Sequence, residues 1–217
     1  MKYLVVASVF VLCIGVLLLG VGFVAYSPGF YDAQFEANRT LDGLAWFGVD
    51  EYGLSDARDK VIAYFWGSSN VLGIDFYTEL ETSHMTDARG IFIVTRILSY
   101  ILTGVGLAML IGLFILMKDN RKWLKGVLWG SAAFLGIVLL IGLVGLLSFN
   151  FAFDIFHEIF FPQGNWQFPA DSAMIIMFPI EFFMTATWII VGVGVGFAAL
   201  LHLVTWGVLL KCRNNNK

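Results

Sequence analysis

The sequence contains three histidines, and two of them lie near an aspartate at the spacing of one helical turn. Asp87 follows His84 by three residues, and Asp154 precedes His157 by three. Positions three apart share one face of a helix, where a carboxylate can hold an imidazole in one tautomer and stabilise the imidazolium. The two pairs therefore indicate acid–base chemistry by histidine. The third histidine, His202, lies inside an apolar run, where we expect it to serve helix packing.

Other catalytic chemistries fit the sequence less well. His157 and Glu158 begin like the zinc-binding motif H-E-x-x-H, but Phe161 stands where the second histidine is required. A metal site assembled from His84, His157 and carboxylates stays open as the weaker alternative, and we expect no cofactor. The sequence has no G-x-S-x-G motif, and its two cysteines lie in an apolar run and at the C-terminal end. A serine or cysteine acyl-enzyme is therefore not supported.

Aromatic residues are unusually frequent around His157. One interpretation is a half-buried platform that accepts acyl chains. An aromatic belt at a membrane interface would have the same composition, and the two interpretations are compatible because both place the histidine at the depth of lipid ester groups. The residues that we expect to contact substrate lipid are Phe153, Phe156, Phe160, Trp166 and Phe168.

The elements that must position these residues are membrane helices. Of the 217 residues, 59% are hydrophobic and 13% are charged, whereas a soluble domain carries about 25% charged residues. Four apolar runs are long enough for a span, which needs roughly 20 residues. They predict an all-α membrane protein with four transmembrane helices at 3–26, 90–117, 126–149 and 180–210. The first run is longer than the core of a signal peptide and ends in bulky residues, so we expect it to be retained.

Two polar segments separate these runs within a single membrane domain, 1–217. The first, 27–89, holds eleven acidic and four basic residues. One helix is predicted there, from a cap at Ser55 to a stop at Gly67, with turns and short extended pieces elsewhere. The second, 150–179, is predicted to be a short interfacial or re-entrant segment.

The charges predict how the chain is oriented. Lys2, the turn at 118–125 and the tail at 211–217 are basic, whereas 27–89 and 150–171 are acidic. With four spans the basic parts share one side, which the positive-inside rule assigns to the cytoplasm. We therefore expect cytoplasmic termini and an extracellular face that carries both candidate histidines. The net charge of −3 suggests no nucleic-acid partner. Separately, we expect the protein to be a monomer.

Several residues could support the chemistry of the histidine pair. Arg96 lies inside a span and needs a partner there, for which we expect Glu181 or Asp171. Tyr31 could donate a hydrogen bond to an oxyanion, although a tyrosine just after a span is usually an interface anchor. The supporting residues that we predict are Asp87, Asp154, Glu158, Arg89, Arg96, Tyr31 and Glu181.

The run from Phe153 to Asp171 resembles the signature of the lipoprotein intramolecular transacylase family of Gram-positive bacteria. It reads F-D-x-F-H-x-x-F-F-x-x-G-N-W-x-F-P-x-D. His84 to Asp87, Tyr31 and the stretch 179–183 fit the same pattern. The resemblance implies a four-span acyltransferase in which the two histidines outside the apolar runs are essential.

The resemblance also implies the reaction and the partners. The sn-2 acyl chain of a diacylglyceryl-cysteine would move to the α-amino group of that cysteine, which gives an N-acyl lyso-form lipoprotein. The implied partners are a diacylglyceryl-modified lipoprotein as substrate and membrane phospholipid.

Histidine suits such an ester aminolysis. The α-amino group has an ordinary pKa of about 7.7–8.0 and histidine one of about 6.5, so an imidazole is a sufficient base. We expect His157 to take the amine proton and His84 to stabilise the oxyanion and protonate the sn-2 oxygen, although the roles could be reversed. Because amine and ester belong to one molecule, no covalent acyl-enzyme is required.

Two functions of other classes remain as alternatives. A small transporter or channel would place charged residues and broken helices near the bilayer midplane, and the middles of the four runs are nearly free of charge. A non-catalytic membrane scaffold would use the segment 27–89 to hold a partner.

Overall fold

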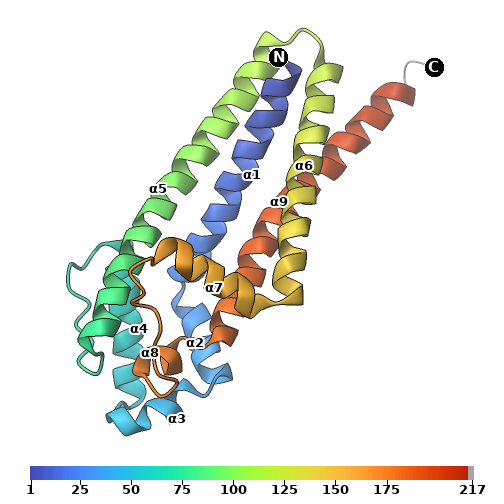
Figure 1. The fold of residues 1–217 in the computed structure, drawn as a ribbon. Helices are drawn as coiled ribbons and strands as arrows, with labels where there is room; N and C mark the ends of the chain where they lie inside the picture. The colour runs from blue at the N-terminus through green and yellow to red at the C-terminus, as the bar shows by residue number, and fades with distance from the viewer. Residues whose placement is uncertain (215–217) are drawn as a thin grey trace. The chain divides into compact units, whose positions relative to one another are not determined.

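The computed structural model describes residues 1–214, which are almost entirely helical (Figure 1). No strand occurs among these residues, which confirms the predicted all-α class. The elements in chain order are α1 (Lys2–Ala25), α2 (Pro28–Ala37), α3 (Thr40–Leu44), the 3-10 helix η1 (Ala45–Phe47), α4 (Glu51–Trp66), α5 (Glu79–Leu116), α6 (Asn120–Leu147), α7 (Phe149–Phe160), α8 (Ala173–Met177) and α9 (Ile180–Asn214).

Four helices, α1, α5, α6 and α9, are long and apolar enough to cross a membrane, which confirms the predicted number of spans. Three of them extend beyond the apolar runs. Helix α5 begins at Glu79, well before the predicted span at 90, because Thr78 and Glu81 form a capping box there. Helix α9 continues to Asn214 through the predicted tail, of which Lys217 lies outside the described residues.

The segment 27–89 is more helical than predicted. Its predicted helix exists and ends at Gly67 in the left-handed conformation, but it begins at Glu51 under an Asp50 cap rather than at Ser55. The predicted turns and extended pieces before it were wrong, since α2, α3 and η1 occupy 28–47. These helices are too short for their hydrophobic periodicity to identify them in the sequence.

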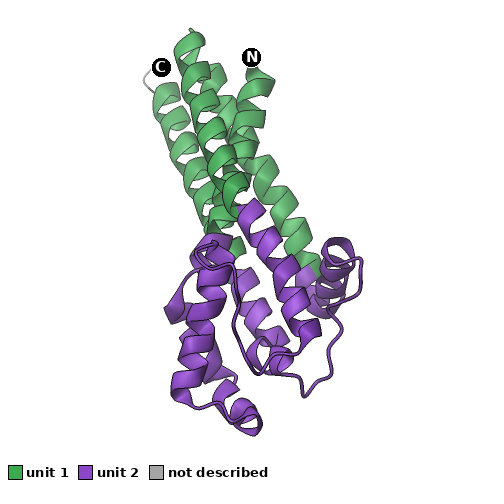
Figure 2. Cartoon of the chain, turned by 90° about the vertical axis from the view of Figure 1, so that its left-hand side faces the viewer, with its two compact units in different colours: residues 1–20, 96–144, 189–217 green, residues 21–95, 145–188 purple. Residues whose placement is uncertain are grey.

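The chain divides into two compact units (Figure 2). Unit 1 comprises 1–20, 96–144 and 189–217, and unit 2 comprises 21–95 and 145–188. Unit 1 contains most of the apolar length of the four long helices and the described basic residues of the predicted cytoplasmic side. Unit 2 contains every acidic residue except Asp119.

Glycines allow the helices of unit 1 to approach one another closely. A Cβ atom added at Gly106 of α5 would lie 2.7 Å from the backbone nitrogen of Leu12 in α1. One added at Gly130 of α6 would lie 2.8 Å from the Cβ atom of Val9. Such small residues are the usual means of close helix packing in lipid, where no hydrophobic force drives helices together.

This packing predicts a position-specific effect of one methyl group. We expect Gly106→Ala to reduce the free energy of unfolding by about 1–3 kcal/mol, because the methyl meets backbone rather than a movable side-chain end. Gly104→Ala on the same helix is the matched control, since nothing lies within 4 Å of an added Cβ there. Unfolding of both variants in mixed micelles measures the difference, and equal stability would contradict the expectation.

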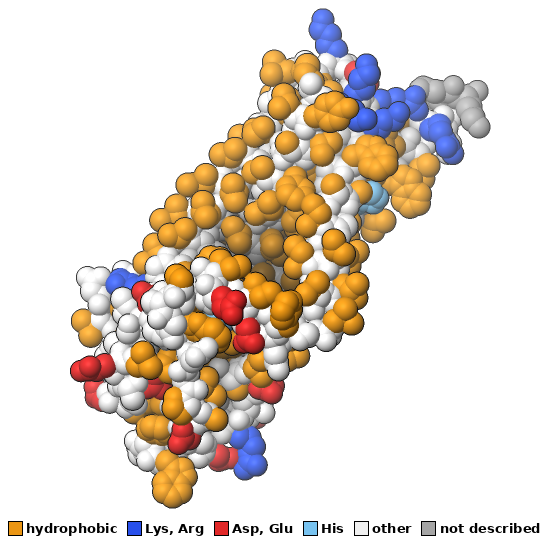
Figure 3. All heavy atoms as spheres, viewed as in Figure 1, with side chains coloured by type: hydrophobic (Ala, Val, Ile, Leu, Met, Phe, Trp, Pro, Cys, Tyr) orange, Lys and Arg blue, Asp and Glu red, His pale blue; other side chains and the backbone are white. Residues whose placement is uncertain are grey.

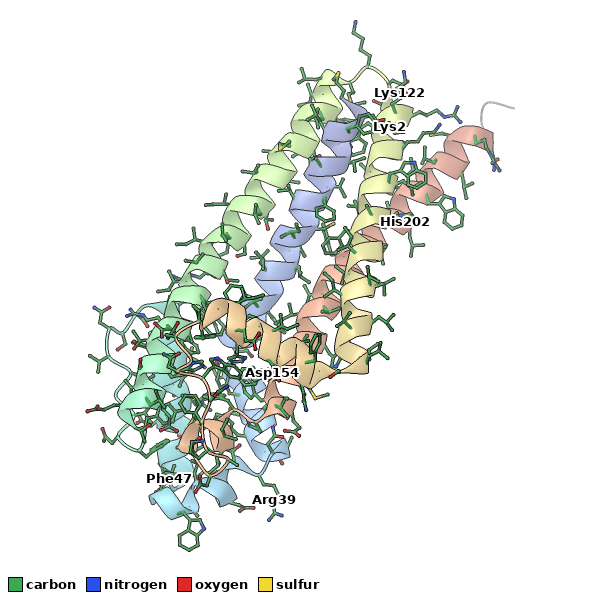
Figure 4. All side chains as sticks on the ribbon, viewed as in Figure 1. Lys2, Arg39, Phe47, Lys122, Asp154 and His202 are labelled. Atoms are coloured by element: carbon green, nitrogen blue, oxygen red, sulfur yellow. The ribbon has the colours of Figure 1, made fainter. Side chains whose placement is uncertain are left out.

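Basic side chains gather at one end of unit 1 (Figures 3 and 4). Lys2 at the start of α1 and Lys122 at the start of α6 both lie at this end. His202 lies on α9, and its Nδ1 is 3.1 Å from the Oγ of Ser131 on α6. This contact fits the packing role predicted for the third histidine.

Candidate active site

Unit 2 packs its short helices around one apolar core that includes Tyr31, Phe35, Leu44, Met177 and Phe182. The start of α5 is fastened to α8 by Glu81, whose side chain is 1% exposed. Its Oε1 accepts a hydrogen bond from the backbone N–H of Met174 at 2.8 Å, and its Oε2 accepts from the N–H of Thr78 at 2.7 Å. These bonds connect the first turns of α5 with α8, and the second of those turns carries His84.

The structure brings the two predicted catalytic histidines together. His84 comes from α5, in the part before the predicted span, and His157 comes from the last turn of α7. Their ring centroids are 6.0 Å apart and their planes are inclined by 20°. His84 is partly buried, and His157 is 6% exposed.

Aromatic rings enclose both imidazoles. The ring centroids nearest His157 belong to Phe153 (4.2 Å), Trp166 (4.9 Å) and Phe156 (5.3 Å), and those nearest His84 belong to Phe161 (4.4 Å) and Phe168 (5.6 Å). Phe160, the other predicted lipid contact, packs on Phe156 at 4.7 Å and is exposed. It therefore lies at the outside of this enclosure.

Burial lowers the pKa of both imidazoles. Removal from water lowers the pKa of His84 from 6.5 to about 4, with a further contribution from His157, while Asp87 and Asn165 act in the opposite direction. The pKa of His157 is also lowered by burial, against the opposing effects of the Phe153 carbonyl and of Asp154. Both rings are therefore neutral at neutral pH.

A backbone carbonyl fixes the tautomer of His157. Its Nδ1 lies 2.8 Å from the carbonyl oxygen of Phe153. A carbonyl oxygen only accepts hydrogen bonds, so Nδ1 carries the proton and Nε2 keeps its lone pair. Asp154, labelled on α7 in Figure 4, is exposed and raises the pKa of His157 through its charge. The neighbouring carboxylate thus tunes this histidine without holding its tautomer.

The carboxylate of Asp87 makes its hydrogen bonds to amides rather than to an imidazole, within the part of the chain that the structure describes. Its Oδ2 accepts from Nε2 of Gln163 and from Nδ2 of Asn165, both at 2.7 Å. Asn165 is 8% exposed. Neither amide was predicted as a site residue, because no spacing rule connects a carboxylate with an amide so distant in sequence. Phe161 was also missed as a ring that contacts His84.

Two other predicted residues have structural partners in unit 2. Arg89 donates from Nη2 to Oδ1 of Asn70 at 3.0 Å and lies 4.6 Å above the ring of Tyr64. The hydroxyl of Tyr31 donates to the carbonyl of Ala25 at 3.1 Å, and burial raises the pKa of this phenol. These contacts stabilise the packing of α4 on α5 and of α2 on α1, respectively.

The remaining predicted residues lie apart from the imidazoles in the chain or at the surface. Glu158 and Glu181 are exposed on α7 and α9. Arg96 belongs to unit 1, and its ion pair with Glu181 or Asp171 stays a prediction. Residues 1–214 contain no group of three or more His, Cys, Asp and Glu side chains placed to hold a metal ion.

Comparison with solved structures reveals the same fold in a known enzyme. The chain is similar to the membrane-integral lipoprotein intramolecular transacylase Lit from Bacillus cereus, with a TM-score of 0.82 at 20% identity over 99% of this chain and 98% of that one. Two structures of that protein with one histidine replaced, by arginine or by alanine, give TM-scores of 0.77 and 0.76, also at 20% identity. They cover 100% and 98% of this chain, and 95% and 96% of those chains.

Sequence comparison adds a distant relative and a family. A protein of Aquifex aeolicus described as uncharacterised is 27% identical over 115 residues, or 51% of this chain, and the chain spans about half of the length of this relative, 48%. The family model described as lipoprotein intramolecular transacylase Lit matches residues 6–183, which include both enclosed histidines and the aromatic run. The chain therefore belongs to the lipoprotein intramolecular transacylase family, Lit.

Proposed function

We propose that this protein transfers the sn-2 acyl chain of a lipoprotein's diacylglyceryl-cysteine to the α-amino group of the same cysteine. The observation that carries the proposal is the stacked pair of neutral imidazoles, His84 and His157, 6.0 Å apart within an aromatic enclosure. At this separation, one lipid head group placed along the edges of the two rings can hydrogen-bond to a nitrogen of each.

His157 is the general base in this proposal. As the amine nitrogen attacks the ester carbonyl, Nε2 of His157 takes a proton from that nitrogen. The lone pair on Nε2 is available because Nδ1 is bonded to the Phe153 carbonyl. The carbon–nitrogen bond forms, the bond between the carbonyl carbon and the sn-2 oxygen breaks, and the imidazolium returns the proton to the departing oxygen.

His84 is the hydrogen-bond donor to the oxyanion. From the sequence we expected His84 both to stabilise the oxyanion and to protonate the sn-2 oxygen. The low pKa of His84 keeps the ring neutral, so in this proposal it only donates a hydrogen bond to the oxyanion. Its Nδ1 is buried with no hydrogen-bond partner among residues 1–214, so we assign to Nε2 the proton that this ring donates to substrate. A donor fixed before the reaction stabilises the charge that develops in the transition state.

The aromatic enclosure suits a transfer that must avoid water. Hydrolysis of the same ester would release a fatty acid, and exclusion of water by the rings of Phe153, Phe161 and Trp166 disfavours it. The amine and the ester are already joined in one molecule, so most of the acceleration comes from orientation. This explains why no nucleophilic side chain is required.

We propose that unit 2 faces the outside of the cell membrane and that both termini are cytoplasmic. The sorting of charge supports this orientation, since Lys2 and the 118–125 turn lie at one end of unit 1 whereas the acidic residues belong to unit 2. One chain supplies both histidines and all the surrounding rings, which supports a monomer working in phospholipid.

The low histidine pKa values predict the pH dependence of the reaction. Below the ordinary pKa of the substrate amine, about 7.7–8.0, we expect kcat/KM to fall tenfold per pH unit as the amine becomes protonated. Because burial lowers the pKa of both imidazoles, to about 4 for His84, the further fall caused by protonation of the enzyme begins at a pH below 6.5, the ordinary pKa of histidine. Initial rates between pH 8 and pH 5 test it, and a further fall that already begins at pH 6.5 or above would contradict it.

The direct test of function is incubation of the purified protein with a synthetic diacylglyceryl lipopeptide. Mass spectrometry with fragmentation locates the acyl chain. We expect the product to have the same mass as the substrate lipopeptide and to carry the acyl chain on the α-amine. Recovery of unchanged lipopeptide, or release of free fatty acid, would reject the proposed transfer.

A further inference from the structure

The loop at 161–169 supplies three of the rings that enclose the histidines. Phe161 and Phe168 contact His84, and Trp166 contacts His157. This loop joins α7 to the segment before α8 and contains no regular helix or strand of its own. A loop of this kind stays over the imidazoles only if specific contacts fasten it there.

The fastening contacts connect the loop with α5, one turn beyond His84. Nε2 of Gln163 and Nδ2 of Asn165 both donate to Oδ2 of Asp87 at 2.7 Å. The two amides also bond each other, with Nε2 of Gln163 3.1 Å from Oδ1 of Asn165. Nδ2 of Asn165 further reaches Oγ of Ser83 at 3.4 Å. Hydrogen bonds to an ionised acceptor are the stronger kind. Asp87 and Gln163 are exposed and Asn165 is 8% exposed, so the bond from Asn165 to Asp87 is partly shielded from water, whereas the bond from Gln163 is open to it.

We propose that Asp87, Gln163 and Asn165 form a clamp that positions the 161–169 loop over the histidine pair and keeps water from the imidazoles. These are positioning residues, which act on the reaction through Phe161 and Trp166 and through the influence of Asp87 and Asn165 on His84. The inference rests on the proposed function for its catalytic meaning, while the clamp itself has a consequence that can be measured without substrate.

That consequence is the protonation of His157. If the clamp opens, Trp166 leaves the imidazole, water enters, and the pKa of His157 rises toward its ordinary value near 6.5. The ionisable groups that face this imidazole are Asp154 on its own helix and His84 on α5, whereas the loop presents only aromatic and amide side chains. None of these facing groups belongs to the clamp.

A pair of substitutions of opposite charge separates hydration from direct electrostatics. Asp87→Asn removes a negative charge and Asn165→Asp adds one, so by charge alone they would move the pKa of His157 in opposite directions. Both open the clamp, the first by weakening the acceptor and the second by setting two carboxylates against each other. Opening of the clamp therefore predicts that the pKa of His157 rises in both variants.

Exchange of the two residues should close the clamp again. In the double variant Asp87→Asn/Asn165→Asp, the amide introduced at position 87 can donate to the carboxylate introduced at 165. Gln163 can still donate to both positions. We expect the pKa of His157 and the rate of acyl transfer to return close to those of the wild type.

The experiment is an NMR titration of His157 in the full-length protein in micelles, with acyl transfer measured in parallel at pH 6 and pH 8. We expect each single variant to raise the pKa of His157. The rate of acyl transfer should fall by up to about a hundredfold, because small displacements of reacting groups have effects of this size, and the loss should be larger at pH 6 than at pH 8. Gln167→Glu, which adds a charge to an exposed amide of the same loop, is the matched control and should behave as the wild type.

Three results would overturn the clamp: an unchanged pKa of His157, shifts of opposite sign in the two single variants, or no recovery in the double variant. If a charged variant does not fold, Gln163→Ala removes one donor without a change of charge, and it should give a smaller rise. A wild-type protein that shows the expected titrations but transfers no acyl chain would reject the proposed function and leave the clamp standing.

Discussion

Replacing His157 by alanine is expected to reduce the rate of acyl transfer by about 10²–10⁴-fold, the usual contribution of a general base. The variant loses the Nε2 lone pair that the Phe153 carbonyl orients. His84→Ala is expected to cost about 10²–10³-fold, as does removal of an oxyanion donor. Because the two groups act on one transition state, the double variant should be little slower than His157→Ala.

The third histidine provides the control for this prediction. His202 bonds Ser131 within unit 1, so His202→Ala should leave the rate near that of the wild type. Mass spectrometry of a synthetic diacylglyceryl lipopeptide gives initial rates, and the amount of membrane-inserted protein normalises them. Full conversion by either active-site variant would reject the histidine mechanism.

Replacing Glu81 by alanine is expected to destabilise unit 2 by about 3 kcal/mol. The carboxylate is 1% exposed and accepts hydrogen bonds from the N–H and hydroxyl of Thr78 and from the N–H of Met174. Its removal leaves the buried N–H of Met174 without an acceptor and detaches α8 from the start of α5. Glu81→Gln, which keeps one carbonyl oxygen, should lose less.

A neighbouring carboxylate serves as the comparison for Glu81. Glu79 lies in the same turn and is exposed, so Glu79→Ala should change the free energy of unfolding by less than about 0.5 kcal/mol. Unfolding of the purified variants in mixed micelles measures both values. Equal stability of the Glu79 and Glu81 variants would show that the buried carboxylate does not fasten α8.

The capping box at the start of α5 was present in the sequence as Thr78-x-x-Glu81. It predicts a helix that begins before the apolar run at 90, which explains why α5 is longer than its membrane span. The third hydrogen bond of Glu81, to Met174, could not be predicted in this way. It joins two segments that are close only after the chain has folded.

For the aspartates beside the histidines, too, the sequence indicated local neighbours but not tertiary hydrogen-bond partners. Helical spacing placed Asp87 on the face of His84 and Asp154 on the face of His157, and both do influence the pKa values of those imidazoles. The hydrogen-bond partners of Asp87 are nevertheless Gln163 and Asn165. Spacing along one helix specifies which side chains are neighbours, but a distant loop with better geometry can occupy the carboxylate.

The sequence by itself determined the four long helices, the end of α4 at Gly67 and the two candidate histidines. These features are local, because an apolar run in lipid must satisfy its backbone within its own helix and a glycine cap acts within one turn. Only the tertiary structure decided that His84 and His157 stack within aromatic rings, with lowered pKa values and with Nδ1 of His157 bonded to the Phe153 carbonyl. Desolvation is the sum of contacts from several segments, so no single stretch of sequence specifies it.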